Sequence, residues 1–395
     1  MANLASIRHT FSSDTVGEIQ LSLRPEYPSG EDPAYLSRQI ITYLGNKRSL
    51  LNAIGTALEK VKRRLGKKKL RTFDVFSGSG VVSRFLKAHS SFLVSNDFED
   101  YAAVISRCYL TNRSTVDFNM LSELVADLNA KVDTVSLPRG FIEELYAPQD
   151  EEHITKQDRV FYTKENARRL DNYRRLIDLA PANVRDLLLG PLLSEASIHA
   201  NTAGVFKGFY KDRRTGIGVF GGTGRDALNR ILGKIELEVP ILSRYECDYE
   251  VIQEDANAAV RMIKNIDLAY IDPPYNQHPY GSNYFMLNLL VNYERPTKIS
   301  RVSGIPVDWR RSGYNSRSKH YPLMRDLLTE LDATHLLVSF NDEGFIPIDE
   351  MRLMLAELGT VEEFKVKYNT FRGCRNLSSR SIHVHEHLFL VEKRW

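Results

Sequence analysis

The stretch Leu70-Arg-Thr-Phe-Asp-Val-Phe76, followed by Ser77-Gly-Ser-Gly80, decides the fold class of this chain. Its apolar residues predict a buried strand over 70–76, the glycines predict a turn, and a helix is expected over 81–88. A second short apolar strand is expected over 92–95, just before Asn96-Asp97. A strand, a turn, a helix and another strand form a βαβ unit, which predicts a Rossmann-like α/β fold with a mostly parallel sheet.

The same alternation of strands and helices returns after residue 245. A helix is predicted over 48–64, and further strands are predicted over 249–253, 267–271, 335–340, 361–369 and 381–392. With the two strands of the first unit, the sheet is expected to contain about seven strands. The 395 residues are enough for two domains, or for one large domain that carries an insertion.

The region between the two alternating parts has a different character. Helices are predicted over 117–135, 165–179 and 183–199, and a stretch rich in Gly, Lys and Arg follows over 203–225. We therefore expect a mainly helical insertion at 111–240 within a catalytic domain formed by 38–110 and 241–395. Residues 1–37 are polar and contain several prolines, which predicts an N-terminal arm with little regular structure.

Composition limits the classes of protein. The net charge of +3 is mildly basic, which is compatible with a nucleic-acid partner but does not require one. Cys108, Cys247 and Cys374 are odd in number and far apart, so neither a disulfide framework nor a CxxC metal site is predicted. The first residues lack the apolar core of a signal peptide and no apolar run is long enough to span a membrane. A reducing cytoplasm is expected.

The glycine turn has the features of a ligand-binding turn. Glycines let the backbone approach a ligand closely, and the start of the following helix offers free N–H groups. In nucleotide-binding folds an acidic residue about 20 positions further on binds the ribose hydroxyls. Asp97 stands at that distance, at the end of the next strand. The alternative for Asp97 is a helix N-cap.

Asp272-Pro273-Pro274-Tyr275 is the strongest chemical signal in the chain. It directly follows the strand predicted over 267–271, and open α/β sheets bind ligands at the carboxyl ends of their strands. The Asp272 carboxylate and the Pro273 carbonyl would accept the two N–H groups of an adenine amine and free its delocalised lone pair. Prolines fix φ and lack an N–H, and Tyr275 offers a face for an extruded base. The alternative is a proline turn with a capping Asp.

Three motifs together resemble those of the Dam-like, alpha-group adenine-specific DNA methyltransferases. These are Tyr43-Leu-Gly45-Asn46-Lys47, the Phe76-Ser-Gly-Ser-Gly80 turn and the Asp272-Pro-Pro-Tyr275 turn, in the order of that family. The resemblance covers about 38–110 and 245–395. The family commonly has Trp where Tyr43 stands and Gly where Asn46 stands.

The resemblance implies S-adenosylmethionine as the methyl donor, and it assigns Asp272, Pro273, Pro274 and Tyr275 to catalysis. Asp255 lies near the family's acid at the adenine end of the cofactor. The residues expected at the cofactor are Tyr43, Gly45, Asn46, Lys47, Asp74, Phe76, Ser77, Gly78, Gly80, Asp97, Asp255 and Asp272. The segments 339–344 and 386–390 are similar to later strand motifs of the family.

Two basic segments are candidate DNA contacts. The segment 205–214 interleaves aromatic and basic residues, and 301–319 is rich in Arg, Gly and Ser. Lys and Arg bind phosphates, and Arg also reads guanine edges. The alternative for each segment is a solvated surface. The residues expected to contact DNA are Lys207, Tyr210, Lys211, Arg213, Arg214, Arg310, Arg311 and Arg317.

The resemblance implies a bacterial modification enzyme that acts on double-stranded DNA in the cytoplasm, at the nucleoid, with a restriction endonuclease acting separately. Neither a metal nor a membrane is expected, and His383, His385 and His387 alternate along a strand without a further ligand cluster. Cytosine C5 methylation is unsupported because no cysteine follows a proline. Methylation of cytosine N4 or of RNA adenine, and a non-catalytic DNA-binding regulator, remain the alternatives.

Overall fold

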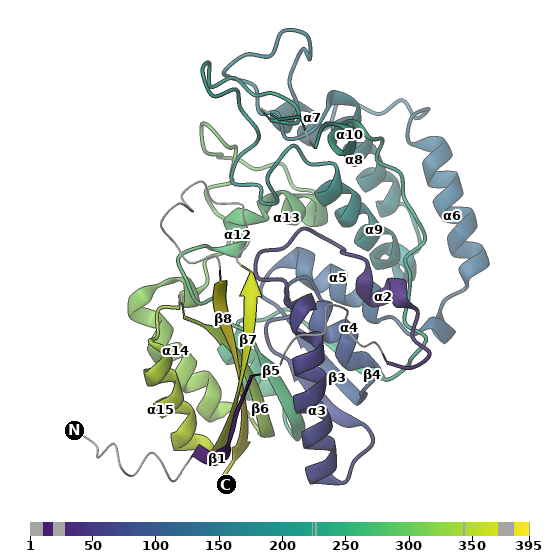
Figure 1. Cartoon of the computed structure of the whole chain (residues 1–395). Helices are drawn as coiled ribbons and strands as arrows, with labels where there is room; N and C mark the ends of the chain where they lie inside the picture. Colours follow the sequence, from purple (N-terminus) through teal and green to yellow (C-terminus); the bar gives the residue numbers. More distant parts are fainter. Residues whose placement is uncertain are drawn as a thin grey trace.

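The computed structural model describes residues 11–18, 28–222, 224–225, 227–342, 344–369 and 383–394. Within these ranges, side chains are described except at 11–18, 367–369 and 383–385. Figure 1 shows one central sheet with helices on both of its faces and a group of further helices above one end. The Rossmann-like α/β fold predicted from the first βαβ unit is therefore confirmed.

In the described part of the chain, the sheet contains eight strands in the order β1-β7-β8-β6-β5-β2-β3-β4. The pairs that include β8 are antiparallel and all other neighbours are parallel. All seven predicted strands are present, and the last is described from His383 onward. The bounds are β1 Phe11–Glu18, β2 Leu70–Asp74, β3 Ser90–Asn96, β4 Asp248–Ile252, β5 Ile266–Ile271, β6 Ala333–Asn341, β7 Gly359–Asn369 and β8 His383–Lys393.

The eighth strand lies in the segment for which little regular structure was predicted. Residues Phe11–Glu18 form β1, which pairs in parallel with β7 at the edge of the sheet. An edge strand exposes unpaired N–H and C=O groups, which an extended segment can satisfy without an apolar pattern of its own. The prediction for 11–18 was wrong for this reason, while residues 1–10 and 19–27 lie outside the described part.

The chain order of the strands places a crevice at the centre of the sheet. From β2 the chain moves outward through β3 to β4, and it then returns to β5 on the other side of β2 and continues to β6. The carboxyl ends of β2 and β5 therefore flank a topological switch point, where α/β sheets bind ligands. All six residues of β5 are buried, because helices cover this strand on both faces.

Helices cover the sheet in two layers. Figure 1 shows α3 and α4 on one side of the sheet and α14 and α15 on the other. Each layer buries its own apolar cluster against the strands. The bounds are α2 Pro33–Ser37, α3 Leu51–Leu65, α4 Val81–Lys87, α5 Asp100–Leu110, α11 Ala256–Met262, α12 Tyr280–Asn283, α13 Phe285–Asn292, α14 Arg317–Glu330 and α15 Ile348–Leu358, with 3-10 helices η1 Lys47–Leu50 and η4 Gly313–Asn315.

Residues 111–240 contain several helices, and they share a core with the rest of the chain. One buried apolar cluster contains Leu121, Tyr162 and Leu188 of this region together with Ile105 of α5 and Leu287 of α13. The region therefore packs on the sheet domain through α5 and α13. Its elements are η2 Arg113–Thr115, α6 Phe118–Lys131, α7 Phe141–Tyr146, α8 Lys164–Asp178, η3 Ala182–Val184, α9 Arg185–Ile198 and α10 Leu228–Leu232.

No helix in the described part of the chain has the length and apolar character needed to cross a bilayer. Cys108 and Cys247 are free and buried, while Cys374 lies outside the described residues.

Candidate active site

The glycine turn between β2 and α4 is fixed to the end of the neighbouring strand β3. The Gly78 N–H donates to one oxygen of the Asp97 carboxylate at 2.7 Å, and the other oxygen accepts from the Glu99 N–H at 2.9 Å. Gly78 and Gly80 have φ values of 51° and 72°, in the left-handed region that favours glycine. Burial raises the pKa of Asp97, although these N–H donors oppose the shift. Asp97 therefore holds the turn as well as facing the cleft.

Tyr43 closes one end of the crevice by lying directly on the glycine turn. A Cβ atom at Gly78 would lie 2.7 Å from the Tyr43 hydroxyl oxygen. The Tyr43 ring stacks on the rings of Tyr280 and Tyr284, with centroids 5.0 Å apart in both cases. The ring is therefore held between aromatic neighbours and the backbone of the turn.

Asp74, the last residue of β2, presents a buried acceptor without a partner. The Ser83 hydroxyl donates to Asp74 Oδ2 at 2.6 Å. Oδ1 has no hydrogen-bond partner among the described residues. Burial raises the pKa of this carboxyl to about 7, and the Ser83 hydrogen bond opposes that rise. A buried oxygen in this state calls for a donor, which a bound ligand can supply.

The Asp-Pro-Pro-Tyr turn begins where β5 ends, so Asp272 lies at the mouth of the crevice. Lys47 Nζ lies 3.2 Å from Asp272 Oδ1 and 2.6 Å from Glu386 Oε1. Burial raises the pKa of Asp272 to about 7; the Lys47 ammonium opposes the rise and the Glu386 carboxylate adds to it. Burial acts to lower the pKa of Lys47, but the two carboxylates raise it well above its ordinary value.

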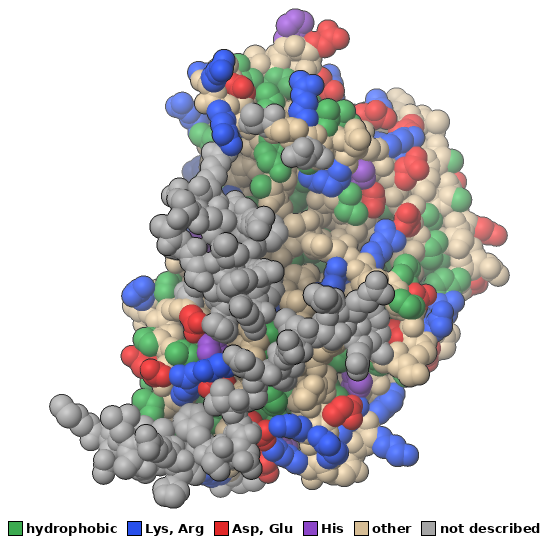
Figure 2. All heavy atoms as spheres, viewed as in Figure 1, with side chains coloured by type: hydrophobic (Ala, Val, Ile, Leu, Met, Phe, Trp, Pro, Cys, Tyr) green, Lys and Arg blue, Asp and Glu red, His purple; other side chains and the backbone are tan. Residues whose placement is uncertain are grey.

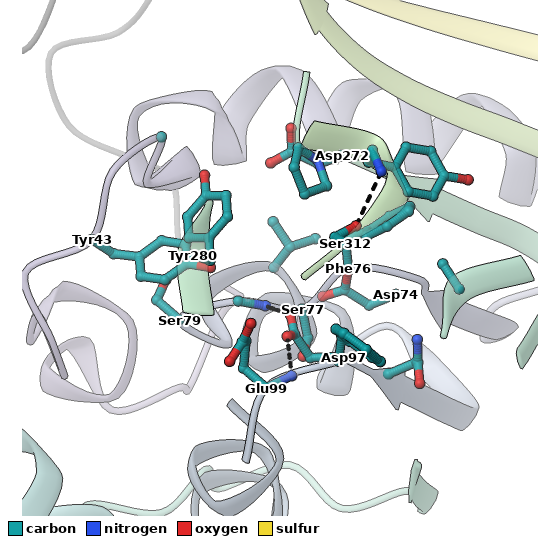
Figure 3. Close-up of a pocket in the computed structure, with 18 of the residues that line it drawn as sticks. Tyr43, Asp74, Phe76, Ser77, Ser79, Asp97, Glu99, Asp272, Tyr280 and Ser312 are labelled. Carbon is teal, nitrogen blue, oxygen red and sulfur yellow. Dashed lines mark hydrogen bonds between the residues drawn. The ribbon is translucent and has the colours of Figure 1, made fainter. Parts of the chain in front are cut away.

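Tyr43, Lys47, Asp74, Gly78, Asp97 and Asp272 line one cleft of about 860 Å³. Figure 3 shows Asp272 on one side of the cleft, Asp97 and Glu99 on the other, and Tyr43 and Tyr280 at one end. Most of the residues predicted at the cofactor line it, namely Tyr43, Gly45, Asn46, Lys47, Asp74, Phe76, Ser77, Gly78, Asp97, Asp255 and Asp272. Gly80 instead caps α4.

The remaining residues of the catalytic motif take different positions. Pro274 lines the cleft, whereas Pro273 and Tyr275 are not among its lining residues. The Tyr275 ring packs edge-on against Phe340, with centroids 5.7 Å apart, and Lys47 Nζ lies 5.6 Å from its centroid. Asp255 also caps α11, because its carboxylate accepts from the N–H of Asn257 at 3.0 Å.

Several cleft residues were not predicted from the sequence. Glu99 is buried, which raises its pKa to about 7, and its Oε2 accepts from Asn288 at 2.6 Å. A second group comes from the Arg-rich loop, and it consists of Ser312, Tyr314 and Asn315. The Asn315 amide donates to the Asn276 carbonyl at 2.8 Å, which ties this loop to the segment after the catalytic turn. Sequence spacing carries no signal for such a loop contact.

The residues predicted to contact DNA divide into two groups. Arg310 lines the cleft and lies 3.0 Å from the Asp100 carboxylate, while the Arg317 guanidinium lies over the Phe345 ring. Arg311 donates to the backbone carbonyls of Trp309 and Val307. In the other segment, Lys207, Arg213 and Arg214 are exposed, and Lys211 is half-buried with its ammonium over the Phe209 ring.

The basic segment 205–214 contacts α12, the short helix that follows the Asp-Pro-Pro-Tyr turn. The Phe206 N–H donates to the Asn283 carbonyl at 2.7 Å, and the rings of Phe206 and Phe209 pack in a buried cluster with Phe161. Figure 2 shows Lys and Arg side chains at the upper left of the molecule, where Figure 1 draws the connection between α9 and α10.

Within the described residues, no group of three or more His, Cys, Asp or Glu side chains could hold a metal ion. The side chains of His383 and His385 lie outside that description. His387 is engaged instead with two carboxylates, since its Nδ1 lies 2.7 Å from Glu363 Oε1 and its Nε2 lies 2.9 Å from Asp342 Oδ1.

Known methyltransferases resemble this chain over most of its length. The chain is 26% identical to Type II methyltransferase M.NlaIII of Neisseria lactamica over 89% of its own length and 99% of that protein. It is 26% identical to Type II methyltransferase M.CviAII of Paramecium bursaria Chlorella virus 1, over 98% of that protein. It is 27% identical to Modification methylase StsI of Streptococcus sanguinis, of which it spans 52%. The family model of the D12 class matches residues 43–352, which include the glycine turn and the Asp-Pro-Pro-Tyr turn. The chain therefore belongs to the D12 class of N6 adenine-specific DNA methyltransferases.

Proposed function

We propose that this enzyme transfers the methyl group of S-adenosylmethionine to N6 of an adenine flipped out of double-stranded DNA, as the modification enzyme of a restriction-modification system. The observation that carries the proposal is that the Asp272 carboxylate and the Gly78 turn line the same cleft. The relatives named as Type II and modification methylases support the biological setting. A cognate endonuclease would act as a separate partner.

The residues at the switch point fit this methyl donor. The unpartnered Asp74 oxygen suits its ammonium group, and the Asp97 carboxylate suits its ribose hydroxyls. The left-handed turn at Gly78 leaves room for a close backbone approach. When bound, S-adenosylmethionine supplies an electrophilic methyl group on a positively charged sulfur. The side chains Asp74, Asp97 and Asp272 would hold it, together with backbone at 77–78.

The catalytic turn would then act on the target amine by positioning and hydrogen bonding. The lone pair of the adenine N6 atom is delocalised into the ring, so the free amine is a weak nucleophile. Asp272 would accept one N–H and the Pro273 carbonyl the other, which draws the nitrogen toward tetrahedral geometry. Two consecutive prolines keep this backbone rigid and free of donors. Tyr275 would stack on the extruded base after a rotation of its ring from Phe340.

Residues 111–240 would form the target-recognition domain. Phe206 joins the basic segment to Asn283 at the end of α12, and Tyr280 of the same helix lines the cleft, so DNA bound to this segment would lie near the cleft. Lys207, Arg213 and Arg214 are exposed and Lys211 is half-buried, so their charges are available for phosphates. In the sequence, Tyr210 lies between Lys207 and Lys211. Arg311 and Arg317 would contact the DNA backbone from the other side, whereas the position of Arg310 favours a role at the cofactor.

The test is a methyl-transfer assay on unmethylated plasmid DNA, followed by digestion and analysis of the nucleosides. Methylation at adenine N6 is the expected result. Methylcytosine would support N4 chemistry instead, transfer to RNA alone would identify an RNA enzyme, and DNA binding without any product would indicate a non-catalytic regulator. Each of these three results would overturn the proposal.

A further inference from the structure

Glu386 is a buried carboxylate at the catalytic end of the sheet that lies outside the region matched by the family. It belongs to β8, whereas the family match ends at residue 352. Its side chain is 6% exposed. Its Oε1 lies 2.6 Å from Lys47 Nζ and accepts a 2.7 Å hydrogen bond from the Ser339 hydroxyl of β6. The carboxylate is therefore fixed by contacts with two other parts of the chain.

Lys47 is shared unequally between two carboxylates. The distance from its Nζ to Glu386 is 2.6 Å, and the distance to Asp272 is 3.2 Å. An ammonium held tightly by Asp272 alone would occupy the oxygen that the target amine needs and would weaken it as an acceptor. Glu386 competes for the same ammonium. The shorter contact shows which carboxylate holds it more closely.

We propose that Glu386 is a positioning residue that holds the Lys47 ammonium toward β8, so that Asp272 keeps its acceptor capacity for the adenine amine. This inference rests on the proposed function. Glu386 acts through Lys47 and touches neither substrate nor cofactor. Two buried carboxylates, Asp272 and Glu386, share one cation, Lys47. One positive charge does not balance two negative charges, so the catalytic turn keeps a net negative charge.

The charged and titratable groups around this pair come from every neighbouring element. Burial and the charge of Glu386 raise the pKa of Asp272 to about 7, and the Lys47 ammonium opposes this rise. The groups that face the pair are Lys47 of η1, Asp74 of β2, Tyr270 of β5, Tyr275 of the turn and Tyr280 of α12. His387 is paired elsewhere, with Glu363 and Asp342.

The main variant is Glu386→Gln, which keeps the shape and the acceptor for Ser339 but removes the charge. Asp272 then loses a like charge and gains a larger share of Lys47, so its pKa falls. We expect the acidic limb of kcat/KM against pH to move to lower pH by about one unit. We expect kcat on the plateau to fall about tenfold, the size of change that one weakened hydrogen bond produces.

The matched control is Glu392→Gln on the same strand. Glu392 is half exposed and lies 3.6 Å from Arg64, away from the cleft. Both its pH profile and its kcat should equal those of the unmodified enzyme. If Glu386→Gln also leaves the limb and kcat unchanged, or lowers kcat without moving the limb, the positioning role is refuted. A purely structural ion pair would change stability and leave the limb in place.

A second measurement avoids catalysis. The affinity of the DNA-free protein for S-adenosylmethionine, measured by calorimetry between pH 6 and 9, should rise as Asp272 ionises. In Glu386→Gln this rise in affinity should occur at lower pH. Equal pH dependences would contradict the inference. If Glu386→Gln does not fold, Glu386→Asp takes its place, since it withdraws the carboxylate from Lys47 and should move the limb in the same direction by a smaller amount. An unmoved limb in that variant refutes the inference as well.

Failure of the two proposals can be told apart. If the unmodified enzyme forms no N6-methyladenine in DNA, the proposed function fails. If it forms this product and the Glu386 variants match it at every pH, only the role of Glu386 fails.

Discussion

Replacing Gly78 by Ala tests whether the glycine turn is shaped by its contact with Tyr43. The new Cβ atom would lie 2.7 Å from the Tyr43 hydroxyl oxygen and 2.8 Å from a ring carbon. The ring has little freedom to retreat, because Tyr280 and Tyr284 stack on it at 5.0 Å. The variant therefore forces either the turn or the aromatic stack to move.

The size of the effect follows from two separate terms. A left-handed φ costs a residue with a Cβ about 1 to 2 kcal/mol, and overpacking a tight site adds about 1 to 3 kcal/mol. Gly66 provides the matched control, since its φ is 63° and nothing lies within 4 Å of an added Cβ. Gly66→Ala should show the first term alone. The change of the unfolded chain is the same in both variants and cancels.

The assay is denaturant unfolding of both variants with and without S-adenosylmethionine, together with the dissociation constant of the donor. Gly78→Ala should lose about 1 to 3 kcal/mol more than Gly66→Ala, and it should bind the donor at least about tenfold more weakly. Adding Tyr43→Ala should relieve much of the excess, as a double-mutant cycle would reveal. Equal losses in Gly78→Ala and Gly66→Ala would refute the claim that Tyr43 presses on the turn.

Three further predictions concern the cleft and the DNA surface. Asp272→Asn should reduce methyl transfer by about a thousandfold or more while circular dichroism and thermal unfolding stay near those of the parent; substantial residual transfer would contradict its role. Burial raises the pKa of Asp74 and Asp272 from 3.8 to about 7, so the contribution of these two carboxyls to the free energy of unfolding without cofactor should fall as pH rises across that window. Asp74→Asn should lessen this fall yet weaken donor binding, as titration calorimetry and urea unfolding at several pH values can check, whereas kcat/KM of the parent should rise with pH through about 7. Replacing four basic residues by Ala should weaken DNA binding and flatten its dependence on salt in a fluorescence anisotropy titration, and unchanged affinity would remove this segment from the interface; the four are Lys207, Lys211, Arg213 and Arg214.

The parts of the fold that sequence predicted are those with strong local patterns. The strand before Gly78 and the strand before Asp272 are apolar runs that end in unmistakable turns, and the structure brings both ends to one cleft. All seven strands with such patterns are present. Local hydrophobicity and turn chemistry were sufficient here, because buried parallel strands must be apolar on both faces.

The parts that sequence did not predict depend on contacts between distant segments. Strand β1 forms because the edge of β7 accepts an extended partner, and no apolar pattern marks it. Arg310 was placed among DNA contacts by its charge, yet its loop folds back to Asp100 at the cleft. Glu386 lies on a strand without a distinctive motif, and only its contact with Lys47 indicates a role for it. Residue type and spacing along the sequence do not predict such contacts between distant segments.

The pairing of Lys47 with Glu386 has a consequence for how the enzyme is made. The two residues are 339 positions apart, and β8 enters between β6 and β7 rather than at an edge. Contacts of such high contact order form late and slowly. A nascent chain on the ribosome that has not yet been extended to residue 386 therefore lacks the ion pair, and catalytic competence should arrive in one late step of folding, after most of the secondary structure is in place.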